Sequence, residues 1–499
     1  MNKLKILIVS SEAVPFAKTG GLANVAGALP KALKKLGHDV RVILPKYRMV
    51  TSDKPLRKVG KSLSISIGDE EEAAVIKMVA HNQVPFYFVC NNRYFDREGL
   101  YGTSAGDYPD NDRRFTFFCQ ATLKMLKEID FQPDIIHCND WQTGLIPVYL
   151  STIFKEDQFF KDCGALFTVH NLGYQGNFPA SSLKVTGLPR NLFSLNGLEF
   201  YGQVSFLKGG LLFSQTINTV SHTYSKEIQT EEFGYGLDGV LRERASDLSG
   251  VINGIDYDEW NPAIDTDISQ NYTPATLSDK EKNKENLLKE QGLNFKKDVP
   301  LIGIVGRLTS QKGFDIFSEL IGRLMRHKLQ IILLGTGEEI YHRFFTRQAL
   351  KYPEKFALNL TYNNALAHKI YAGSDFFLMP SLYEPCGLGQ LISLKYGTVP
   401  IVRKTGGLAD TVFEFNQKEG TGNGFLFENY SSEELLTAIK QALKVYGKKH
   451  LFKKLVLNGM NQDFSWEHSA NEYLKLYLKA ILKKKGNYET HERREKDES

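Results

Sequence analysis

The sequence predicts an α/β protein with two doubly wound domains, each a mostly parallel sheet covered by helices. Both halves of the chain alternate short apolar, β-rich runs with amphipathic helical stretches. A length of 499 residues exceeds the usual size of one hydrophobic core, and 42% of the residues are apolar. The heptapeptide Lys-Thr-Gly-Gly-Leu-Ala-Asn at 18–24 returns as Lys-Thr-Gly-Gly-Leu-Ala-Asp at 404–410, so each half carries one copy.

The first half holds the strands of one predicted sheet. They span residues 5–9, 39–44, 85–90, 134–138, 165–169 and 216–220. Helices are expected to begin near Gly21, Asp112, Thr143, Gly202 and Ser221. A smaller strand pair at 63–67 and 73–80 interrupts the alternation. We assign residues 1–252 to this N-terminal domain.

The alternation restarts at residue 300. The predicted strands are 301–305, 330–334, 376–379 and 399–402, and helices should follow Gly313, Glu338, Asn364, Gly387 and Gly407. A linker is placed at 253–279, which is rich in Asp, Pro, Thr and Asn, within a second domain at 253–466. Residues 467–485 predict one long amphipathic helix. Residues 486–499 are densely charged and predict disorder.

Composition excludes several classes of function. The net charge of +5 is small and the basic residues are spread along the chain, which argues against a nucleic-acid partner. No apolar run approaches the roughly 20 residues of a membrane span, and the apolar N-terminal run is too short for a signal peptide. Five widely spaced cysteines without a C-x-x-C pair fit a reducing cytoplasm and argue against structural zinc.

Each copy of the heptapeptide follows an apolar segment and opens a helical stretch. Unpaired N–H groups and the positive end of the helix dipole gather at such a turn, which suits a phosphate or another anion. Glycine could instead be needed only for a tight strand-to-helix turn. The repetition favours the anion-binding interpretation.

Polar residues follow the predicted strands, where parallel sheets bind ligands. Asp140 and His170 occupy such positions in the first half, although a helix cap and a structural histidine are alternatives. In the second half, Arg307 and Lys312 could grip a diphosphate, with a solvated basic turn as the alternative. Glu384 is placed to accept hydrogen bonds from sugar hydroxyls, or it is a first-turn acid favoured by a helix dipole.

Two Asp-x-Asp triplets, at 110–112 and 265–267, invite a metal interpretation. The first precedes a helix and resembles a cap, and the second lies in the linker. No further ligands surround either in the sequence, so both are interpreted as structural and no metal is predicted.

Together, the Lys-Thr-Gly-Gly-Leu turn, Asp140-Trp141, His170-Asn171, Arg307 with Lys312, and Glu384-Pro385-Cys386-Gly387-Leu388 closely resemble bacterial glycogen synthases and plant starch synthases. The resemblance runs from about residue 5 to about residue 478. It implies a GT-B glycosyltransferase with a deep interdomain cleft, which extends an α-1,4-glucan from ADP-glucose with retention at the anomeric carbon. No transit segment precedes Met1, so the bacterial branch is expected.

The resemblance also implies roles for single residues and no cofactor. The glucan acceptor belongs to the N-terminal domain and the nucleotide-sugar donor to the C-terminal one, with the helix at 467–485 crossing back. The implied catalytic or reacting-centre residues are Glu384, His170, Asp140, Arg307 and Lys312. The implied donor contacts are Lys18, Gly20, Gly21, Arg307, Lys312, Tyr362 (on the adenine), Cys386, Gly387, Leu388 and Gly389. The oligomeric state is not predicted.

Two positions depart from the family pattern. Asn24 stands where the family usually has Asp, which removes a charge, and Gly389 replaces the usual Thr, which removes a hydroxyl. Competing interpretations are a UDP-glucose synthase, a glucan phosphorylase with pyridoxal phosphate, and a non-catalytic glucan or sugar-nucleotide binder. The joint presence of Lys18, His170 and Glu384 with the cationic pair argues against the binder. A dehydrogenase is a more distant alternative, because the acid that binds ribose is missing.

Overall fold

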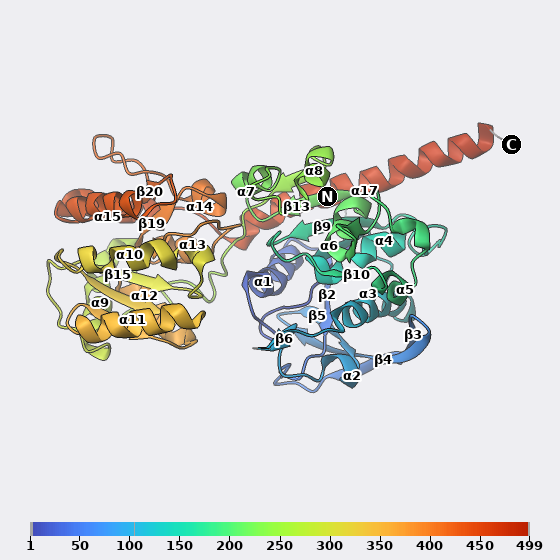
Figure 1. The fold of residues 1–499 in the computed structure, drawn as a ribbon, viewed down its shortest axis with the longest axis horizontal. Coiled ribbons are helices and arrows are strands. Elements are labelled where there is room, and N and C mark those ends of the chain that lie inside the picture. Colours follow the sequence, from blue (N-terminus) through green and yellow to red (C-terminus); the bar gives the residue numbers. More distant parts are fainter. Residues whose placement is uncertain (1–2, 104, 498–499) are drawn as a thin grey trace. The chain divides into compact units, whose positions relative to one another are not determined.

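The structure, a computed structural model, describes residues 3–103 and 105–497. The chain forms two units, each built around its own sheet (Figure 1). Unit 1 comprises Met1–Val220, Ser225–Gly254 and Trp466–Ser499, and unit 2 comprises Ser221–Tyr224 and Ile255–Ser465. The main change of unit therefore falls after Gly254, where the sequence placed it after residue 252.

Unit 1 is built around a nine-stranded sheet. In spatial order its strands are β14 (Leu248–Gly250), β13 (Thr216–Thr219), β9 (Gly164–Val169), β8 (Ile135–Asn139), β1 (Lys5–Val9), β2 (Asp39–Pro45), β5 (Val84–Cys90), β4 (Glu70–His81) and β3 (Arg57–Ile67). The strands from β14 to β5 pair in parallel. β4 and β3 add an antiparallel hairpin at one edge, which is the small strand pair that the sequence predicted.

Helices cover this sheet, and every residue of the central strands β8 and β9 is buried. The helices are α1 (Gly21–Lys35), α2 (Asn92–Phe95), α3 (Asn111–Glu128), α4 (Leu145–Ser151), α5 (Ser182–Thr186), α6 (Phe206–Phe213), α7 (His222–Glu227, of which residues 222–224 are grouped with unit 2), α8 (Asp238–Glu243) and α17 (Trp466–Asp497). α17 packs against β9 and α1. Two short antiparallel sheets complete the unit: β10 (Asn177–Pro179), β12 (Gln203–Ser205) and β11 (Glu199–Phe200); and β6 (Gly102–Thr103) with β7 (Gly106–Asp107).

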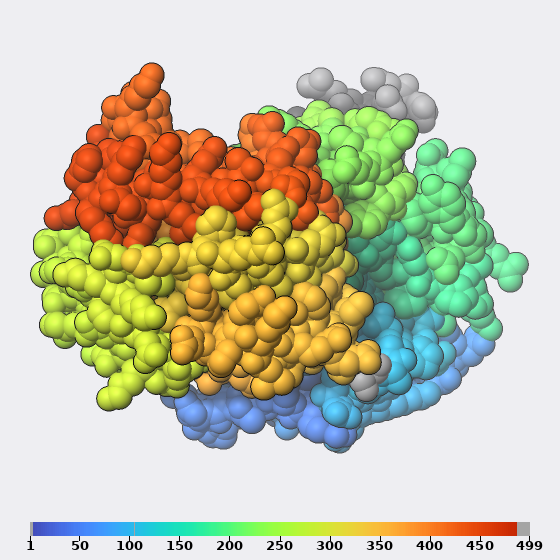
Figure 2. Space-filling model, turned by 60° about the vertical axis from the view of Figure 1, so that its left-hand side comes forward, coloured from blue at the N-terminus to red at the C-terminus, as the bar shows by residue number. Residues whose placement is uncertain are grey.

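Unit 2 is built around a six-stranded, fully parallel sheet. Its strands in spatial order are β17 (Phe356–Asn359), β16 (Gln330–Leu334), β15 (Leu301–Val305), β18 (Phe376–Met379), β19 (Val399–Arg403) and β20 (Phe425–Phe427). Its helices are α9 (Lys280–Glu290), α10 (Phe314–Leu324), α11 (Glu339–Lys351), α12 (Asn364–Gly373), α13 (Gly389–Lys395), α14 (Gly406–Thr411), α15 (Ser432–Tyr446) and α16 (Lys449–Met460). The loop between α14 and β20 pairs Asn416 with Thr421 and projects from the surface of the unit (Figure 2).

In both sheets the first strand of the unit lies inside the sheet and the later strands are added on both sides. β1 pairs with β2 on one side and with β8 on the other. β15 pairs in the same way with β16 and β18. Helices diverge at such a switch point, which leaves a crevice beyond the carboxyl ends of the two strands. The topology therefore predicts one half-site after β1 and β8 and another after β15 and β18.

Two segments differ from the sequence prediction. The proposed linker at 253–279 belongs largely to unit 2, where the Tyr272 hydroxyl donates to the carbonyl of Tyr396 at 2.8 Å. The backbone of α17 continues to Asp497, past the predicted end at 485 and through the stretch for which disorder was predicted. That stretch is rich in Glu, Lys and Arg, which favour helix as well as solvation, so composition does not separate the two outcomes. Within the described residues, no helix is long and apolar enough to cross a membrane.

Candidate active site

The half-site of unit 1 begins with Glu12, which follows β1 and is only 3% exposed. Its carboxylate accepts a hydrogen bond from the N–H of Thr19 and others from the N–H of Gly20 (3.2 Å) and the Thr19 hydroxyl (2.5 Å). The hydroxyl of Tyr101 also donates to it at 2.7 Å. A carboxylate of the chain itself therefore occupies the inner side of the turn before α1, a position that attracts anions.

The outer side of the same turn is open. Lys18 and Gly21 are exposed, and a methyl group built on Gly20 or Gly21 would meet no atom within 4 Å. A phosphate that used the N–H of Gly20 would share that donor with Glu12 or displace the Glu12 carboxylate. The sequence prediction missed Glu12, although its place directly after β1 is the same signal that pointed to Asp140.

Asp140 follows β8 with φ 56° and ψ 179°, a conformation that residues other than glycine rarely adopt. Its carboxylate accepts a hydrogen bond from the N–H of His170 at 2.7 Å. The alternative of a helix cap is wrong, because the Asp140 side chain does not cap the short 3₁₀ helix Trp141–Thr143. Burial raises the pKa of Asp140 to about 7, and the nearby charge of Glu12 also raises this pKa.

His170 follows β9 and is 9% exposed. Its Nε2 lies 2.9 Å from Oδ1 of Asn139, the last residue of β8. Burial lowers the pKa of His170 to about 3, so the ring is neutral near pH 7 and can take part in catalysis through hydrogen bonds, not as a cation. Since β1, β8 and β9 are neighbours in the sheet, Glu12, Asp140 and His170 gather at one edge.

The half-site of unit 2 centres on Glu384, which is 5% exposed. Lys312 Nζ lies 2.6 Å from Glu384 Oε2, and the Ser381 hydroxyl donates to the same oxygen at 3.0 Å. Lys312 follows β15 and Glu384 follows β18, so the switch point brings together two residues that lie far apart in sequence. For Lys312, the alternative of a solvated basic turn is wrong. The ion pair uses Oε2 of Glu384 and leaves its other oxygen, Oε1, outside this contact.

A cavity of about 130 Å³ lies beyond the carboxyl ends of β15 and β18. The residues that line it include Gly306, Lys312, Tyr371, Ser381, Glu384, Gly387, Leu388 and Gly389. A Cβ on Gly389 would come within 2.8 Å of Phe377 Cε1, so a larger residue there would need Phe377 to move. This contact gives a physical reason for glycine at the position where the family usually has Thr.

The remaining predicted residues of unit 2 lie around this cavity in different ways. Arg307 is exposed and directly follows Gly306, which lines the cavity. Cys386 is buried and Tyr362 is 76% exposed on the loop after β17, and neither is among the lining residues. The structure therefore brings together Lys312, Glu384 and the turn before α13, while Tyr362 could reach a ligand only from outside this cavity.

The second copy of the heptapeptide supports the backbone that carries Glu384. The N–H of Gly407 donates to the carbonyl oxygens of Glu384 (3.1 Å) and Pro385 (3.2 Å). A Cβ on Gly407 would overlap the backbone of Cys386, and a Cβ on Gly406 would overlap the carbonyl of Glu384. Glycine is needed here for a close approach of two backbone segments, not for an anion.

The polar ends of this second copy have partners within unit 2. Lys404 Nζ pairs with Glu428 at 2.7 Å. Asp410 accepts hydrogen bonds from the N–H (2.8 Å) and the hydroxyl (2.6 Å) of Thr223. The two copies are therefore alike in sequence and different in use.

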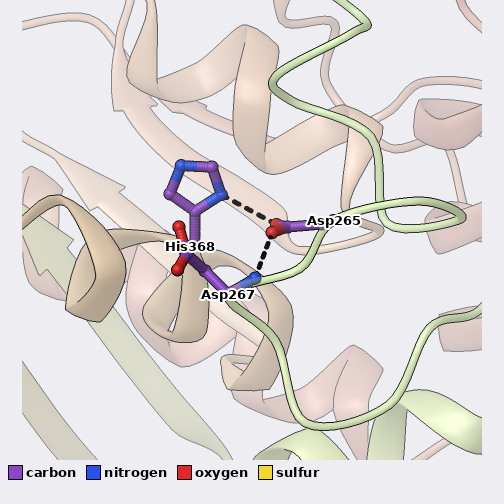
Figure 3. Close-up of side chains that lie close together, drawn as sticks. All are labelled: Asp265, Asp267 and His368. Carbon is purple, nitrogen blue, oxygen red and sulfur yellow. Dashed lines mark hydrogen bonds and ion pairs between the residues drawn. The ribbon is translucent and has the colours of Figure 1, made fainter.

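The two Asp-x-Asp triplets have structural roles, but not all in the predicted form. Asp110 does not cap α3, and its carboxylate pairs with Arg97 at 2.6 Å. The prediction that no further ligand surrounds the second triplet is wrong, because His368 Nδ1 lies 2.7 Å from Asp265 Oδ2 (Figure 3). The Tyr396 hydroxyl donates to the same oxygen at 2.5 Å.

The contacts of Asp265 and His368 favour a structural role for this second cluster. Asp265 Oδ1 accepts a hydrogen bond from the N–H of Asp267 at 2.8 Å (Figure 3). The Trp260 ring stacks on His368 with ring centroids 3.9 Å apart. Both Asp265 oxygens thus have donors, so the cluster fastens the segment after Ile255 to α12.

Comparison with solved structures supports the fold of the two doubly wound units. The fold matches the catalytic domain of starch synthase IV from Arabidopsis thaliana bound to ADP and acarbose, with a TM-score of 0.90 and 34% identity over 96% of this chain and 100% of that chain. It also matches sucrose-phosphate synthase from Thermosynechococcus elongatus, with a TM-score of 0.61 and 15% identity over 95% and 98% of the two chains, which bears on the fold alone. Two doubly wound units, each with a half-site at its switch point, define a GT-B glycosyltransferase.

Sequence comparison specifies the family. Residues 5–243 match the starch synthase catalytic domain and residues 286–455 match glycosyl transferases group 1. The chain is 49% identical to a glycogen synthase from Geotalea daltonii over 97% of this chain and 100% of that protein. It is 48% identical to a glycogen synthase from Thermotoga maritima over 96% and 99% of the two chains. The chain belongs to the glycogen synthase family, which confirms the fold and the enzyme class predicted from the sequence.

Proposed function

We propose that this enzyme transfers glucose from ADP-glucose to the non-reducing end of an α-1,4-glucan, with retention of the anomeric configuration. The observation that carries this proposal is the Lys312–Glu384 pair at 2.6 Å, on the cavity at the switch point of unit 2. In this pair, the Lys312 cation can bind a diphosphate and the adjacent Glu384 carboxylate can accept hydrogen bonds from sugar hydroxyls. The related starch synthase bound to ADP and acarbose supports a nucleotide diphosphate and a glucan-like ligand as the pair of substrates.

In this proposal, unit 2 holds the donor. Arg307 and Lys312 neutralise the diphosphate, and the N–H groups of Leu388 and Gly389 donate to its oxygens. Glu384 accepts hydrogen bonds from the glucosyl hydroxyls. Tyr362 stacks on the adenine, for which its exposed ring is available.

Unit 1 holds the acceptor and completes the donor contacts through Lys18, Gly20 and Gly21. Retention proceeds by attack on the same face that the diphosphate leaves, and a departing phosphate oxygen takes the proton of the acceptor hydroxyl. A positive, oxocarbenium-like charge develops on the glucosyl ring during this step. Asp140, with its pKa raised to about 7, supplies a carboxylate that can stabilise that charge when ionised.

The proposal is tested by comparing glucose transfer from ADP-glucose and from UDP-glucose to glycogen, without added metal. Faster transfer from ADP-glucose is expected. Faster transfer from UDP-glucose would favour the competing UDP-glucose synthase, and transfer from neither donor would overturn the proposal. An absorption spectrum of the purified protein distinguishes a synthase from a glucan phosphorylase, because the pyridoxal phosphate bound to a phosphorylase absorbs near the visible range.

We also propose the cytoplasm as the location of the enzyme. The five cysteines are widely spaced in the sequence and form no C-x-x-C pair, which fits a reducing compartment.

A further inference from the structure

Asn139 is the last residue of β8 and is 1% exposed. Its Nδ2 donates to the carbonyl oxygen of Val9 at 3.0 Å and lies 3.3 Å from the carbonyl oxygen of His137. Carbonyl oxygens only accept hydrogen bonds, so the amide nitrogen must face them. The orientation of the Asn139 amide is therefore fixed by the two strands β1 and β8, and its Oδ1 points the other way.

The amide oxygen faces the imidazole of His170. Asn139 Oδ1 lies 2.9 Å from His170 Nε2. Because an amide oxygen has no hydrogen to give, the His170 nitrogen must be the donor in this contact. A neutral imidazole carries one hydrogen, so a hydrogen on Nε2 leaves a lone pair on Nδ1.

We propose that Asn139 is a positioning residue that locks His170 in the tautomer with the hydrogen on Nε2 and so presents Nδ1 to the substrate as a hydrogen-bond acceptor. The neighbouring Asp140 fixes the other part of the same residue, since its carboxylate accepts from the N–H of His170 at 2.7 Å. The end of β8 thus holds both the backbone and the ring of His170.

The inference rests on the proposed function for one step, the identity of the donor that Nδ1 accepts. If glucose is transferred at this site, the donor is a sugar hydroxyl. An acceptor at this position selects a sugar with a hydroxyl over a sugar with a hydrogen or a methyl group in its place. Without that hydroxyl, the bound sugar would bury the Nδ1 lone pair of His170, which is only 9% exposed, without a hydrogen-bond donor.

The first test is the ¹⁵N spectrum of the full-length wild-type enzyme labelled only in histidine. The two nitrogens of a neutral imidazole resonate far apart, and their order identifies the tautomer. A His170→Gln variant assigns the signal among the 11 histidines. We expect His170 to be protonated on Nε2 at neutral pH. A spectrum with the hydrogen on Nδ1 would overturn the proposal, and this test requires no variant of Asn139 to fold.

The second test is Asn139→Ala, with Asn218→Ala as the matched control. Asn218 is also a fully buried asparagine, on β13, and it bonds to Thr168 and not to His170. We expect Asn139→Ala to give a mixture of His170 tautomers and a loss of turnover of about 10- to 100-fold, with KM for ADP-glucose changed by less than about threefold. The control should keep the wild-type tautomer and turnover within about twofold.

An Asn139→Ala enzyme that keeps the wild-type tautomer would overturn the proposal, whether or not its turnover falls. So would a shifted tautomer with unchanged turnover. These results differ from failure of the proposed function, in which the wild-type enzyme transfers no glucose although the Nε2-protonated tautomer of His170 is observed.

Discussion

Asp140 combines two features that a folded protein rarely tolerates in one residue. Its backbone lies in a region that is almost restricted to glycine, which costs about 1–3 kcal/mol. Its carboxylate is buried near a second carboxylate, that of Glu12, and burial together with this charge raises its pKa to about 7. Such costs persist where a function needs the side chain in that place, so Asp140 is the best candidate in unit 1 for direct action on the reacting sugar.

The raised pKa gives a test of this environment through Asp140→Asn. The carboxyl titrates at about 4 in the unfolded chain and at about 7 in the folded one, so the folded state binds the extra proton between these values. The contribution of Asp140 to stability therefore falls as the pH rises from about 4 to about 7, and asparagine lacks this fall. Urea unfolding should show the variant gaining stability relative to wild type by about 1–3 kcal/mol between pH 4.5 and pH 8. A pH-independent difference would contradict the raised pKa.

Lys312 pairs with the buried Glu384 and belongs to the proposed diphosphate site, so its truncation should lower both stability and turnover. Lys312→Ala leaves the Glu384 carboxylate buried without its cation and removes a charge from the proposed diphosphate site. We expect turnover to fall by about 10²- to 10³-fold and the free energy of unfolding by about 1–3 kcal/mol. Radiolabelled transfer from ADP-glucose and urea unfolding measure the two effects.

Lys404→Ala is the matched control for Lys312→Ala. Lys404 also belongs to a strand-to-helix turn of unit 2 and pairs with a glutamate, but both side chains of that pair are more than half exposed. Exposed ion pairs contribute little, so this variant should behave as wild type. Unimpaired turnover in Lys312→Ala would refute the assignment of Lys312 to the diphosphate.

The two heptapeptide turns show how one sequence element serves two purposes. Before α1, the turn surrounds a carboxylate on its inner side and is open on its outer side. Before α14, the same glycines lie directly against the Glu384–Cys386 backbone. The difference lies in what packs against each turn, which the seven residues themselves do not encode.

A pair of glycine-to-alanine variants separates the two uses. Gly21→Ala adds a methyl group in open space and replaces glycine at the start of a helix, so stability should be unchanged or slightly higher while KM for ADP-glucose rises. Gly407→Ala forces Cβ into the backbone of Cys386 and should lower the free energy of unfolding by about 2 kcal/mol or more. Thermal unfolding and steady-state kinetics distinguish them, and a reversed pattern would contradict the assignment.

Most strands could be predicted because each is a short apolar run bounded by turn residues, as at 301–305 and 330–334, where prediction and structure coincide. β17 and β20 were missed because they are short and lie near polar loops, and β17 ends in a polar residue, whereas β18, also of four residues, is apolar throughout. Among site residues, position after a strand predicted Asp140, His170 and Glu384. Partnerships could not be predicted, since the contacts of Glu12 with the Thr19 turn and of Asn139 with His170 depend on which strands become neighbours.

The C-terminal helix α17 is tied to the sheet of unit 1 through a buried polar network. His137 Nδ1 lies 2.9 Å from the hydroxyl of Tyr477, and its Nε2 lies 2.6 Å from the hydroxyl of Thr168. Burial lowers the pKa of His137 to about 3, so this histidine is neutral near pH 7. Thr168 lies on β9, two residues before His170, so the last helix of the chain is joined to the strand that ends at the candidate active site.

Tyr477→Phe tests how much this connection contributes. The variant leaves a buried nitrogen of His137 without its partner, which should lower the free energy of unfolding by about 1–3 kcal/mol and raise the sensitivity of unit 1 to proteolysis. Removal of residues 486–499 serves as the control, because this stretch is densely charged in sequence and its loss should leave unfolding unchanged. A stable Tyr477→Phe enzyme would show that the apolar face of α17 alone holds the helix in place.

At the scale of the whole molecule, we propose that the enzyme transfers glucose from ADP-glucose to an α-1,4-glucan with retention. Following the reaction of ADP-glucose with maltotriose by ¹H NMR tests the donor, the acceptor and the stereochemistry at once. We expect an α-1,4-linked glucose to appear on the acceptor as ADP is released. A β-linked product, or free glucose as the sole product, would contradict it.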